Sequence, residues 1–310
     1  MAISASMVKE LREMTGAGMM DCKKALTNTD GDMDKAVDYL RENGLAKAEK
    51  KAGRIAAEGV VKTNISADGK SASIVEVNSE TDFVAKNEKF KDFVGAVAAQ
   101  INASSANDVD AFMEEAWAAD TSKTVKEELA SMIATIGENM NVRRFEKVSV
   151  DNGLVVDYIH AGGKIGVLIV AESDNTGDEV VECLKNVAMQ VAAMNPKYLS
   201  ADDVSEEYKE KEKEVLLAQA KNDPKNAGKP DEIIEKMIIG RLNKELKEVC
   251  LTEQVYVKAE NKETVAKYVE AVAKAVGCNI KLTKFVRFET GEGLEKKNED
   301  FAAEVAAQLK

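Results

Sequence analysis

Apolar residues recur three and four positions apart over residues 1–54, which is the spacing of one face of an α-helix. Turn-forming residues interrupt this pattern at Thr15–Gly18 and at Asn28–Gly31. Gly44 is placed to end a third helix, and a basic stretch from Lys47 to Arg54 follows as a solvated extension. The predicted inward positions are Val8, Leu11, Met19, Cys22, Ala25, Leu26, Met33, Ala36, Val37 and Leu40. We therefore predict a three-helix module over residues 1–54.

Met20 falls outside that apolar face. It shares a side of the second predicted helix with Lys23 and Lys24, so we expect its side chain to be exposed. An exposed methionine beside basic residues is typical of a contact surface, and a lone surface apolar residue is the alternative. The module carries 10 basic and 9 acidic residues in a chain of net charge -12, an asymmetry that favours a separate docking role.

Two hairpin-plus-helix patterns follow, 94 residues apart. In the first, strand-like runs at Gly59–Ile65 and Ser73–Val77 flank a turn at Asp68–Lys70, and an amphipathic helix follows from Phe90 to Ile101. The shift of 94 superimposes pairs of like residues without gaps: Gly59 on Gly153, Val61 on Val155, Ile65 on Ile159, Gly69 on Gly163 and Lys70 on Lys164. The chain therefore contains an internal duplication.

The fold class predicted from these patterns is α+β. The core subdomains are expected at residues 55–145 and at residues 146–202 joined to 251–290. Further predicted helices are Phe112–Trp117, Val125–Ile136 and Thr264–Val276, and further predicted strands are Val255–Lys258 and Ile280–Phe288.

Residues 203–250 interrupt the second copy with a charged helical hairpin. Its second arm carries an apolar stripe made of Ile234, Ile238, Leu242, Leu246 and Val249. A projecting antiparallel pair of this kind is typical of an interaction device, and a hairpin packed only on itself is the alternative. Residues 291–310 contain a last amphipathic helix with Phe301, Val305 and Leu309 on one face.

The loop between strand and helix in the first copy contains the segment Thr81-Asp82-Phe83-Val84. Phe83 is either the first core residue of the following helix or an apolar wedge presented to a partner beside Asp82. The second copy has Asn175-Thr176-Gly177-Asp178 at the corresponding positions. A residue that the scaffold requires would be expected twice, so the difference favours a function for Asp82 and Phe83.

Composition narrows the classes of function. A net charge of -12 and an aromatic content of 5% argue against a nucleic-acid-binding surface. No apolar run is long enough to span a membrane, and the N-terminus lacks a targeting pattern, so we expect a cytoplasmic protein. The four cysteines are far apart and form no CxxC pair, which argues against a zinc site and favours buried thiols.

The sequence offers little for catalysis. His160 is the one histidine, so a Ser-His or Cys-His pair would have to use it. It lies in the hairpin of the second copy, where a turn histidine or a partner contact are the two interpretations. No phosphate-binding glycine motif follows a predicted strand. We therefore expect a protein that is not an enzyme and that needs neither a cofactor nor a metal.

Two motifs carry a family resemblance. They are Leu11-Arg-Glu-Met-Thr-Gly-Ala-Gly-Met-Met-Asp-Cys-Lys-Lys-Ala-Leu26 and Glu76-Val-Asn-Ser-Glu-Thr-Asp-Phe-Val-Ala-Lys86. A tail from Phe285 to Gly293 and from Asp300 to Ala307 fits as well. The chain resembles the bacterial translation elongation factor Ts family over its full length. That resemblance implies a guanine-nucleotide exchange factor for elongation factor Tu, with a ubiquitin-associated-like (UBA-like) N-terminal domain, a coiled-coil arm over residues 203–250 and a Tu-facing C-terminal module.

The resemblance also implies roles for particular residues. Arg12, Met19 and Met20 would dock on the nucleotide-binding domain of Tu. The segment Thr81–Val84 would disturb magnesium binding there, with Phe83 wedged between helices and Asp82 beside it. His160 would meet another domain of Tu. Ser79 and Glu80 stand where relatives can have Cys and Gln, and neither change touches Asp-Phe-Val. Two-fold pairing of the heterodimer occurs in some relatives and not in others.

Two other functions remain as alternatives. One is a binding adaptor, in which the helical module docks on a partner without exchange activity. The other is a hydrolase that uses His160, which the absence of a partner motif disfavours. The exchange factor is the leading hypothesis because both motifs and the duplicated core occur together.

Overall fold

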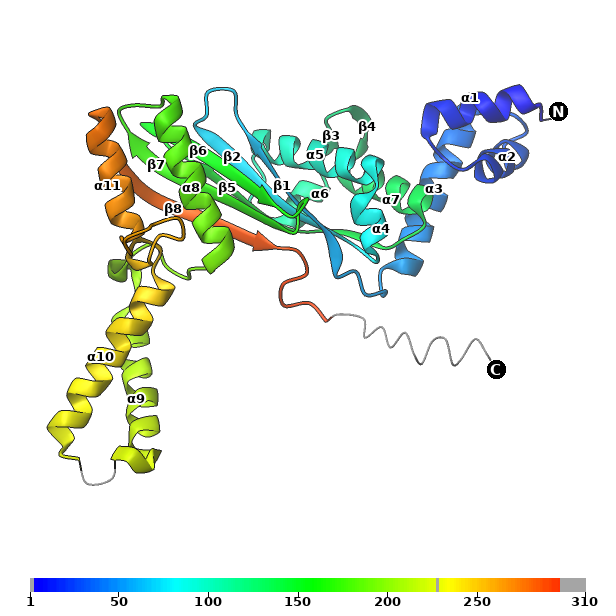
Figure 1. Ribbon diagram of the computed structural model, residues 1–310. Helices are drawn as coiled ribbons and strands as arrows, with labels where there is room; N and C mark the ends of the chain where they lie inside the picture. Colours follow the sequence, from blue (N-terminus) through cyan, green and yellow to red (C-terminus); the bar gives the residue numbers. More distant parts are fainter. Residues whose placement is uncertain (1–2, 227–228, 296–310) are drawn as a thin grey trace.

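The computed structural model describes residues 3–226 and 229–295 (Figure 1). The molecule is elongated. The N-terminal helices lie at one end, two sheets with their helices fill the middle, and a helical arm projects from the other end (Figure 1). None of the helices in the described ranges is long and apolar enough to cross a membrane.

Three helices form the N-terminal module: α1 (Ala5–Thr15), α2 (Met19–Asn28) and α3 (Met33–Lys51). Ser4 caps α1 and Asp32 caps α3 through side-chain oxygens. Their shared core is built from Val8, Leu11, Cys22, Ala25, Leu26 and Ala36. Met19 is not part of it, because its side chain is 59% exposed. The prediction that Met19 faces inward was therefore wrong.

Gly44 does not end the third helix. It lies inside α3 and is buried against α7 (Val125–Ile136), where an added Cβ would be 3.7 Å from the carbonyl oxygen of Ala130. The helix continues because its second half packs on the core, with Ala48 against the main apolar cluster. Residues 47–51 extend α3 as predicted, and five of the eight residues from 47 to 54 are exposed, while Ala48 packs on the core.

The first unit is a three-stranded antiparallel sheet with helices on one face. Its strands are β1 (Glu58–Ile65), β2 (Ser71–Ser79) and β5 (Met140–Ser149), in the order β1-β2-β5. Its helices are α4 (Asp82–Lys86), α5 (Glu88–Ala103), α6 (Val109–Met113) and α7, and a small hairpin is formed by β3 (Ala116–Trp117) and β4 (Asp120–Thr124). The helix predicted through Trp117 stops at Met113, because Trp117 pairs in β3 and packs its ring on Phe93.

The second unit repeats this arrangement. Its sheet has the order β6-β7-β8, with β6 (Gly153–His160), β7 (Ile165–Ser173) and β8 (Ile280–Glu289). The helices α8 (Asp178–Met194) and α11 (Val265–Val276) cover it. The strand predicted at residues 255–258 is absent from this described segment, where only a single bridge joins Val255 to Thr264. The predicted hairpins, the helix α11 and the strand β8 are confirmed.

The duplication extends further than the sequence suggested. Strands β2 and β7 are offset by 94 residues, whereas α7 and α11, and likewise β5 and β8, are offset by 140. Both sheets carry a bulge at the same place, at Glu76/Val77 and at Val170/Ala171. The offsets differ by 46 residues because the second unit carries the arm of α9 (Glu206–Asn222) and α10 (Asp231–Val249) where the first unit carries α6, β3 and β4. One duplicated unit therefore accounts for the strands and helices that the two halves share.

The two units meet about an approximate two-fold axis. Val61 N–H donates to the Gly163 carbonyl over 2.7 Å, and the equivalent Val155 N–H donates to the Gly69 carbonyl over 2.8 Å. Thr63 bonds to Asp157, its own counterpart at an offset of 94, so this pair lies on the axis. A shared apolar cluster lies beneath them: Val61, Ala72, Ile74, Val148, Val155, Leu168, Val170, Val286 and Phe288. The core consequently behaves as an internal dimer.

The arm is a helical hairpin in which three of the five predicted stripe residues are buried, and Leu246 and Val249 are half-buried. Ile234, Ile238 and Leu242 are the buried ones, and the first two pack against Ala220 of α9. The coiled-coil assignment stays a prediction. The last predicted helix, with Phe301, Val305 and Leu309, lies outside the described residues, which end at position 295. Residues 291–294 form turns.

Candidate functional site

The segment Thr81–Val84 forms the start of a short helix that is separate from the one after it. The Thr81 hydroxyl oxygen accepts a hydrogen bond from Val84 N–H and caps α4. Asn87 then ends α4 and at the same time caps α5, accepting from Lys89 N–H and Phe90 N–H. The chain thus changes direction between the two helices, which gives α4 its own orientation.

Phe83 points out of the molecule. Its side chain is 81% exposed, the largest value among the exposed large apolar residues of the described chain. Its neighbours Val84 and Ala85 are buried in the core of the first unit and hold the helix down. The interpretation of Phe83 as the first core residue was therefore wrong, and Phe90 fills that place. An aromatic ring left in water on an anchored helix is typical of a partner contact.

Asp82 lies beside Phe83 as a charged group. Lys86 Nζ donates to Asp82 Oδ2 over 2.6 Å. This hydrogen bond lowers the pKa of Asp82, with smaller contributions from the charges of Lys86 and Lys164. The carboxylate therefore stays ionised at neutral pH, and an apolar ring and an anion are presented together.

Two carboxylates anchor the loop from behind. Glu138 accepts two hydrogen bonds from Thr81, one from its N–H over 3.0 Å and one from its hydroxyl over 2.7 Å. Glu80 accepts from Asn139 N–H over 2.6 Å and pairs with Arg54. Only the second anchor recurs in the other unit, where Asp174 accepts from Asn279 N–H over 2.8 Å. The position equivalent to Glu138 is Cys278, so the clamp on Thr81 belongs to the first unit alone.

A second group of charged residues was missed by sequence reasoning. Glu76 has no exposed surface, and its carboxylate accepts hydrogen bonds from Arg143 and Arg144 on β5 and from Gly291 N–H after β8. Burial raises the pKa of Glu76, but these bonds and one from Asn78 outweigh it and hold the pKa below its ordinary value. A lone glutamate within the apolar run of β2 was the available signal.

The residues expected to dock lie elsewhere. Arg12, Met19 and Met20 are all exposed on α1 and α2, Met20 at 73%, which confirms the prediction for Met20. Figure 1 places these helices at the end of the molecule, away from α4. His160 ends β6, is exposed, and its Nδ1 lies 3.0 Å from the hydroxyl of Tyr158. The predicted residues therefore lie at three separate sites: Thr81–Val84 at α4, Arg12 with Met19 and Met20 on α1 and α2, and His160 at the end of β6.

The comparisons with known proteins agree with this architecture. The family model described as Elongation factor TS matches residues 80–292. A curated Elongation factor Ts from Clostridium novyi is 55% identical over 307 residues, 99% of each chain. One from Clostridium perfringens is 56% identical over 304 residues, 98% of each chain. The chain belongs to the elongation factor Ts family.

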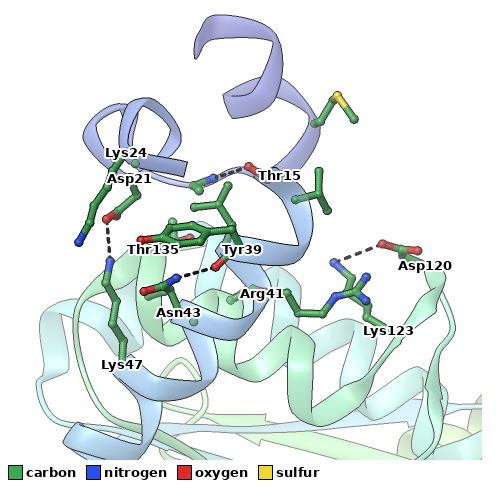
Figure 2. A pocket seen from close by; sticks show the side chains of 18 of the residues that line it. Thr15, Asp21, Lys24, Tyr39, Arg41, Asn43, Lys47, Asp120, Lys123 and Thr135 are labelled. Atoms are coloured by element: carbon green, nitrogen blue, oxygen red, sulfur yellow. Dashed lines mark hydrogen bonds and ion pairs between the residues drawn. The ribbon is translucent and has the colours of Figure 1, made fainter. Parts of the chain in front are cut away.

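This elongation factor Ts family member also has a cavity of about 150 Å³ between the N-terminal module and α7 (Figure 2). Figure 2 shows Lys47 directed at Asp21 and Lys123 at Asp120, and these ion pairs include four of the six charged side chains of the wall. Among the described residues no group of three metal-ligating side chains occurs. The cavity is part of the seam between module and core, and it is not next to the Thr81–Val84 segment.

Proposed function

We propose that this chain is a guanine-nucleotide exchange factor for elongation factor Tu, acting in the cytoplasm during translation elongation. Membership of the elongation factor Ts family supports this assignment. The single observation that carries the mechanism is the 81% exposed ring of Phe83 on a helix anchored through Val84 and Thr81. The factor works by binding and uses no acid, base or nucleophile of its own.

Exchange requires a difference in affinity. GDP on a GTPase is held by phosphate-binding backbone groups and by Mg²⁺. A factor speeds GDP release only if it binds the empty state better than the loaded one, and the coupling is reciprocal. In our proposal Phe83 enters between helices of the Tu nucleotide domain, and the Thr81–Val84 segment disturbs its Mg²⁺ and phosphate site. The Phe83 ring would be buried in a site that exists only in the empty state of Tu, and this burial makes the factor bind the empty state more tightly than the GDP-loaded state.

Other contacts hold the partner in place. Arg12, Met19 and Met20 are proposed to dock on the nucleotide domain, which their exposure on α1 and α2 supports. His160 is proposed to contact another domain of Tu from the end of β6. Two-fold pairing of the resulting heterodimer stays a prediction. An adaptor without exchange activity is the second candidate; it would use Phe83 as a contact made equally with the loaded and the empty partner.

The test is the release of fluorescent GDP from elongation factor Tu at fixed Mg²⁺, with and without this chain. We expect the chain to speed release and Phe83→Ala to reduce the maximal rate about 10- to 100-fold, because a buried phenylalanine contributes about 1.5–3 kcal/mol. Thermal unfolding should be unchanged, since the ring makes little contact with its own protein.

Val255→Ala is the matched control, because it removes an apolar side chain that is 52% exposed on the second unit. It should leave release unchanged. Wild-type acceleration that survives Phe83→Ala would move the mechanism away from the wedge. Binding of Tu without any acceleration would make the adaptor the better assignment.

A further inference from the structure

The buried carboxylate of Glu76 joins the two units of the core. It lies on β2 of the first unit and accepts from Gly291 N–H over 2.8 Å, a residue that follows β8 of the second unit. Arg143 Nη2 donates to the Glu292 carbonyl over 2.6 Å, and Arg144 Nη2 donates to the Glu289 carbonyl over 3.2 Å. The segment 289–292 is thus held by three groups of the first unit. We call this cluster the Glu76 joint.

The duplicated scaffold does not require this joint. At the equivalent positions of the second unit stand Val170 in place of Glu76, Thr283 in place of Arg143 and Lys284 in place of Arg144. Val170 is buried in the shared apolar cluster. The same sheet, with the same bulge, therefore folds around a valine. Because a buried ion pair is often no more stabilising than a well-packed apolar residue, fold stability alone does not explain the joint.

The joint and the Thr81–Val84 segment lie on the same stretch of chain. Glu76 and Thr81 are five positions apart on β2 and the loop that continues it. Thr290, next to Gly291, donates to the carbonyl oxygens of Lys164 and Gly163. The side chain of Lys164 pairs with Glu58 and lies close enough to Asp82 to lower its pKa. Hydrogen bonds and an ion pair therefore link the end of the second unit to Lys164 and Glu58, and the charge of Lys164 acts on Asp82 in the loop of the first unit.

We propose that Glu76 is a positioning residue for nucleotide exchange, which locks the angle between the two units so that the force on Phe83 is transmitted to the partner. This inference rests on the proposed function. Phe83 belongs to the first unit and His160 to the second, and a partner that contacts both pushes the units against each other. If the two units can rotate relative to each other, Phe83 yields with the first unit, and the helices of the partner are not displaced. A buried joint with charge-assisted bonds resists that rotation.

The test is a double-mutant cycle between Glu76→Gln and Phe83→Ala, measured as the maximal rate of GDP release from elongation factor Tu. Glutamine keeps the size of Glu76 and removes its charge. We expect Glu76→Gln to lower the maximal rate about tenfold in the wild-type background. In the Phe83→Ala background it should lower the rate less than twofold, because there is no wedge to support. A purely structural role predicts the same loss in both backgrounds, and that result would overturn the proposal.

A second variant reaches the joint from the other side. Gly291 has φ +74°, and an added Cβ would overlap the carbonyl oxygen of Ala57. Gly291→Ala should therefore displace the segment while leaving Glu76 paired with both arginines. It should reproduce the loss of rate and the dependence on Phe83 if Glu76→Gln folds poorly. An unchanged rate in Gly291→Ala with a displaced segment would also reject the joint as a positioning device.

Two controls separate this inference from the proposed function. Glu146→Gln removes the half-exposed ion pair with Lys284 between the same two units, and it should change the rate less than twofold. Amide hydrogen exchange at Gly291, read without any partner, should be faster in Glu76→Gln than in the wild type. If the wild-type chain fails to release GDP, the proposed function is wrong. If release is normal and Gly291 exchanges equally in both proteins, the joint is wrong and the function stands.

Discussion

The clamp of Glu138 on Thr81 fixes the direction of α4, and with it the direction of Phe83. Removing the carboxylate in Glu138→Ala leaves the N–H and hydroxyl of Thr81 to water, because both currently bond to Glu138. We expect the maximal rate of GDP release to fall about tenfold or more, because a hydrogen bond to a charged group contributes about 1.5–3 kcal/mol to the ordering of the loop. Stopped-flow release of fluorescent GDP measures this effect.

The matched control for Glu138 is Asp174→Ala. It removes the carboxylate that accepts from Asn279 N–H at the equivalent loop of the second unit. Asp174→Ala should lower the free energy of unfolding by about 1 kcal/mol in urea, a loss similar to that of Glu138→Ala. The maximal rate of GDP release should not change. Equal losses of rate in both variants would mean that the clamp supports the fold only.

At the scale of residues, the sequence was informative about exposure and weak about long-range charge. Met20 was recognised because it falls outside the apolar face of its helix, and Phe83 because the second copy has no counterpart to it. The partners of Glu76 and Thr81 could not be predicted. Gly291 is 215 positions from Glu76, and Glu138 is 57 positions from Thr81. Pairs so distant in the chain become visible only when the sheets are assembled.

At the scale of elements, we predict that one substitution within α3 raises the free energy of unfolding, whereas most substitutions lower it. Gly44 is helical, and its added Cβ would lie 3.7 Å from the Ala130 carbonyl, an ordinary contact. Alanine avoids the entropic cost of glycine in a helix, so Gly44→Ala should raise the free energy of unfolding by about 0.5–1 kcal/mol. Thermal or urea unfolding measures the change.

Gly137 provides the opposite case within the same pair of helices. It ends α7 with φ +94°, a conformation that disfavours a side chain. Gly137→Ala should therefore lower the free energy of unfolding by about 1 kcal/mol. If both substitutions destabilise, the contact between α3 and α7 is tighter than an ordinary van der Waals contact. The sequence treated Gly44 as a helix end because local rules ignore the tertiary packing that carries α3 onward.

Periodic elements were predicted well, and irregular ones were not. The two hairpins and the helices α5, α8, α10 and α11 follow clear apolar patterns. The small β3–β4 hairpin and the single bridge at Val255 are short, and their residues fit a helix or a strand equally well by spacing. In those two segments the backbone conformation is set by tertiary packing, because Trp117 and Tyr256 are buried in the cores of their units.

At the scale of the whole molecule, function is expected where the internal symmetry breaks. The two units share strands, bulges and helix ends at fixed offsets, and each adds features that the other lacks. The first unit adds α4 with Phe83, the Glu138 clamp and the Glu76 joint. The second unit adds the arm of α9 and α10. Duplication supplied a rigid frame, and the asymmetric additions are the parts free to serve a partner.

This division of labour leads to different kinetic effects at the two ends of the molecule. Met19 and Met20 lie on α2, away from α4 (Figure 1). A docking contact that is equal in the loaded and empty states of Tu changes affinity without changing the maximal rate, whereas a contact made only in the empty state changes the rate itself. The double substitution Met19→Ala with Met20→Ala should therefore raise the concentration for half-maximal release about tenfold and leave the maximal rate within twofold.

Phe83→Ala should show the reverse pattern, with a lower maximal rate and a smaller change in that concentration. Val257→Ala, which removes an apolar side chain 49% exposed on the second unit, should alter neither quantity. The measurement is the dependence of GDP release on the concentration of the factor. A lower maximal rate in the methionine variant would mean that the N-terminal module takes part in displacing the nucleotide. The contact of Met19 and Met20 and the contact of Phe83 would then act together on the maximal rate, and the proposed division between an affinity contact on α2 and a rate contact on α4 would be wrong.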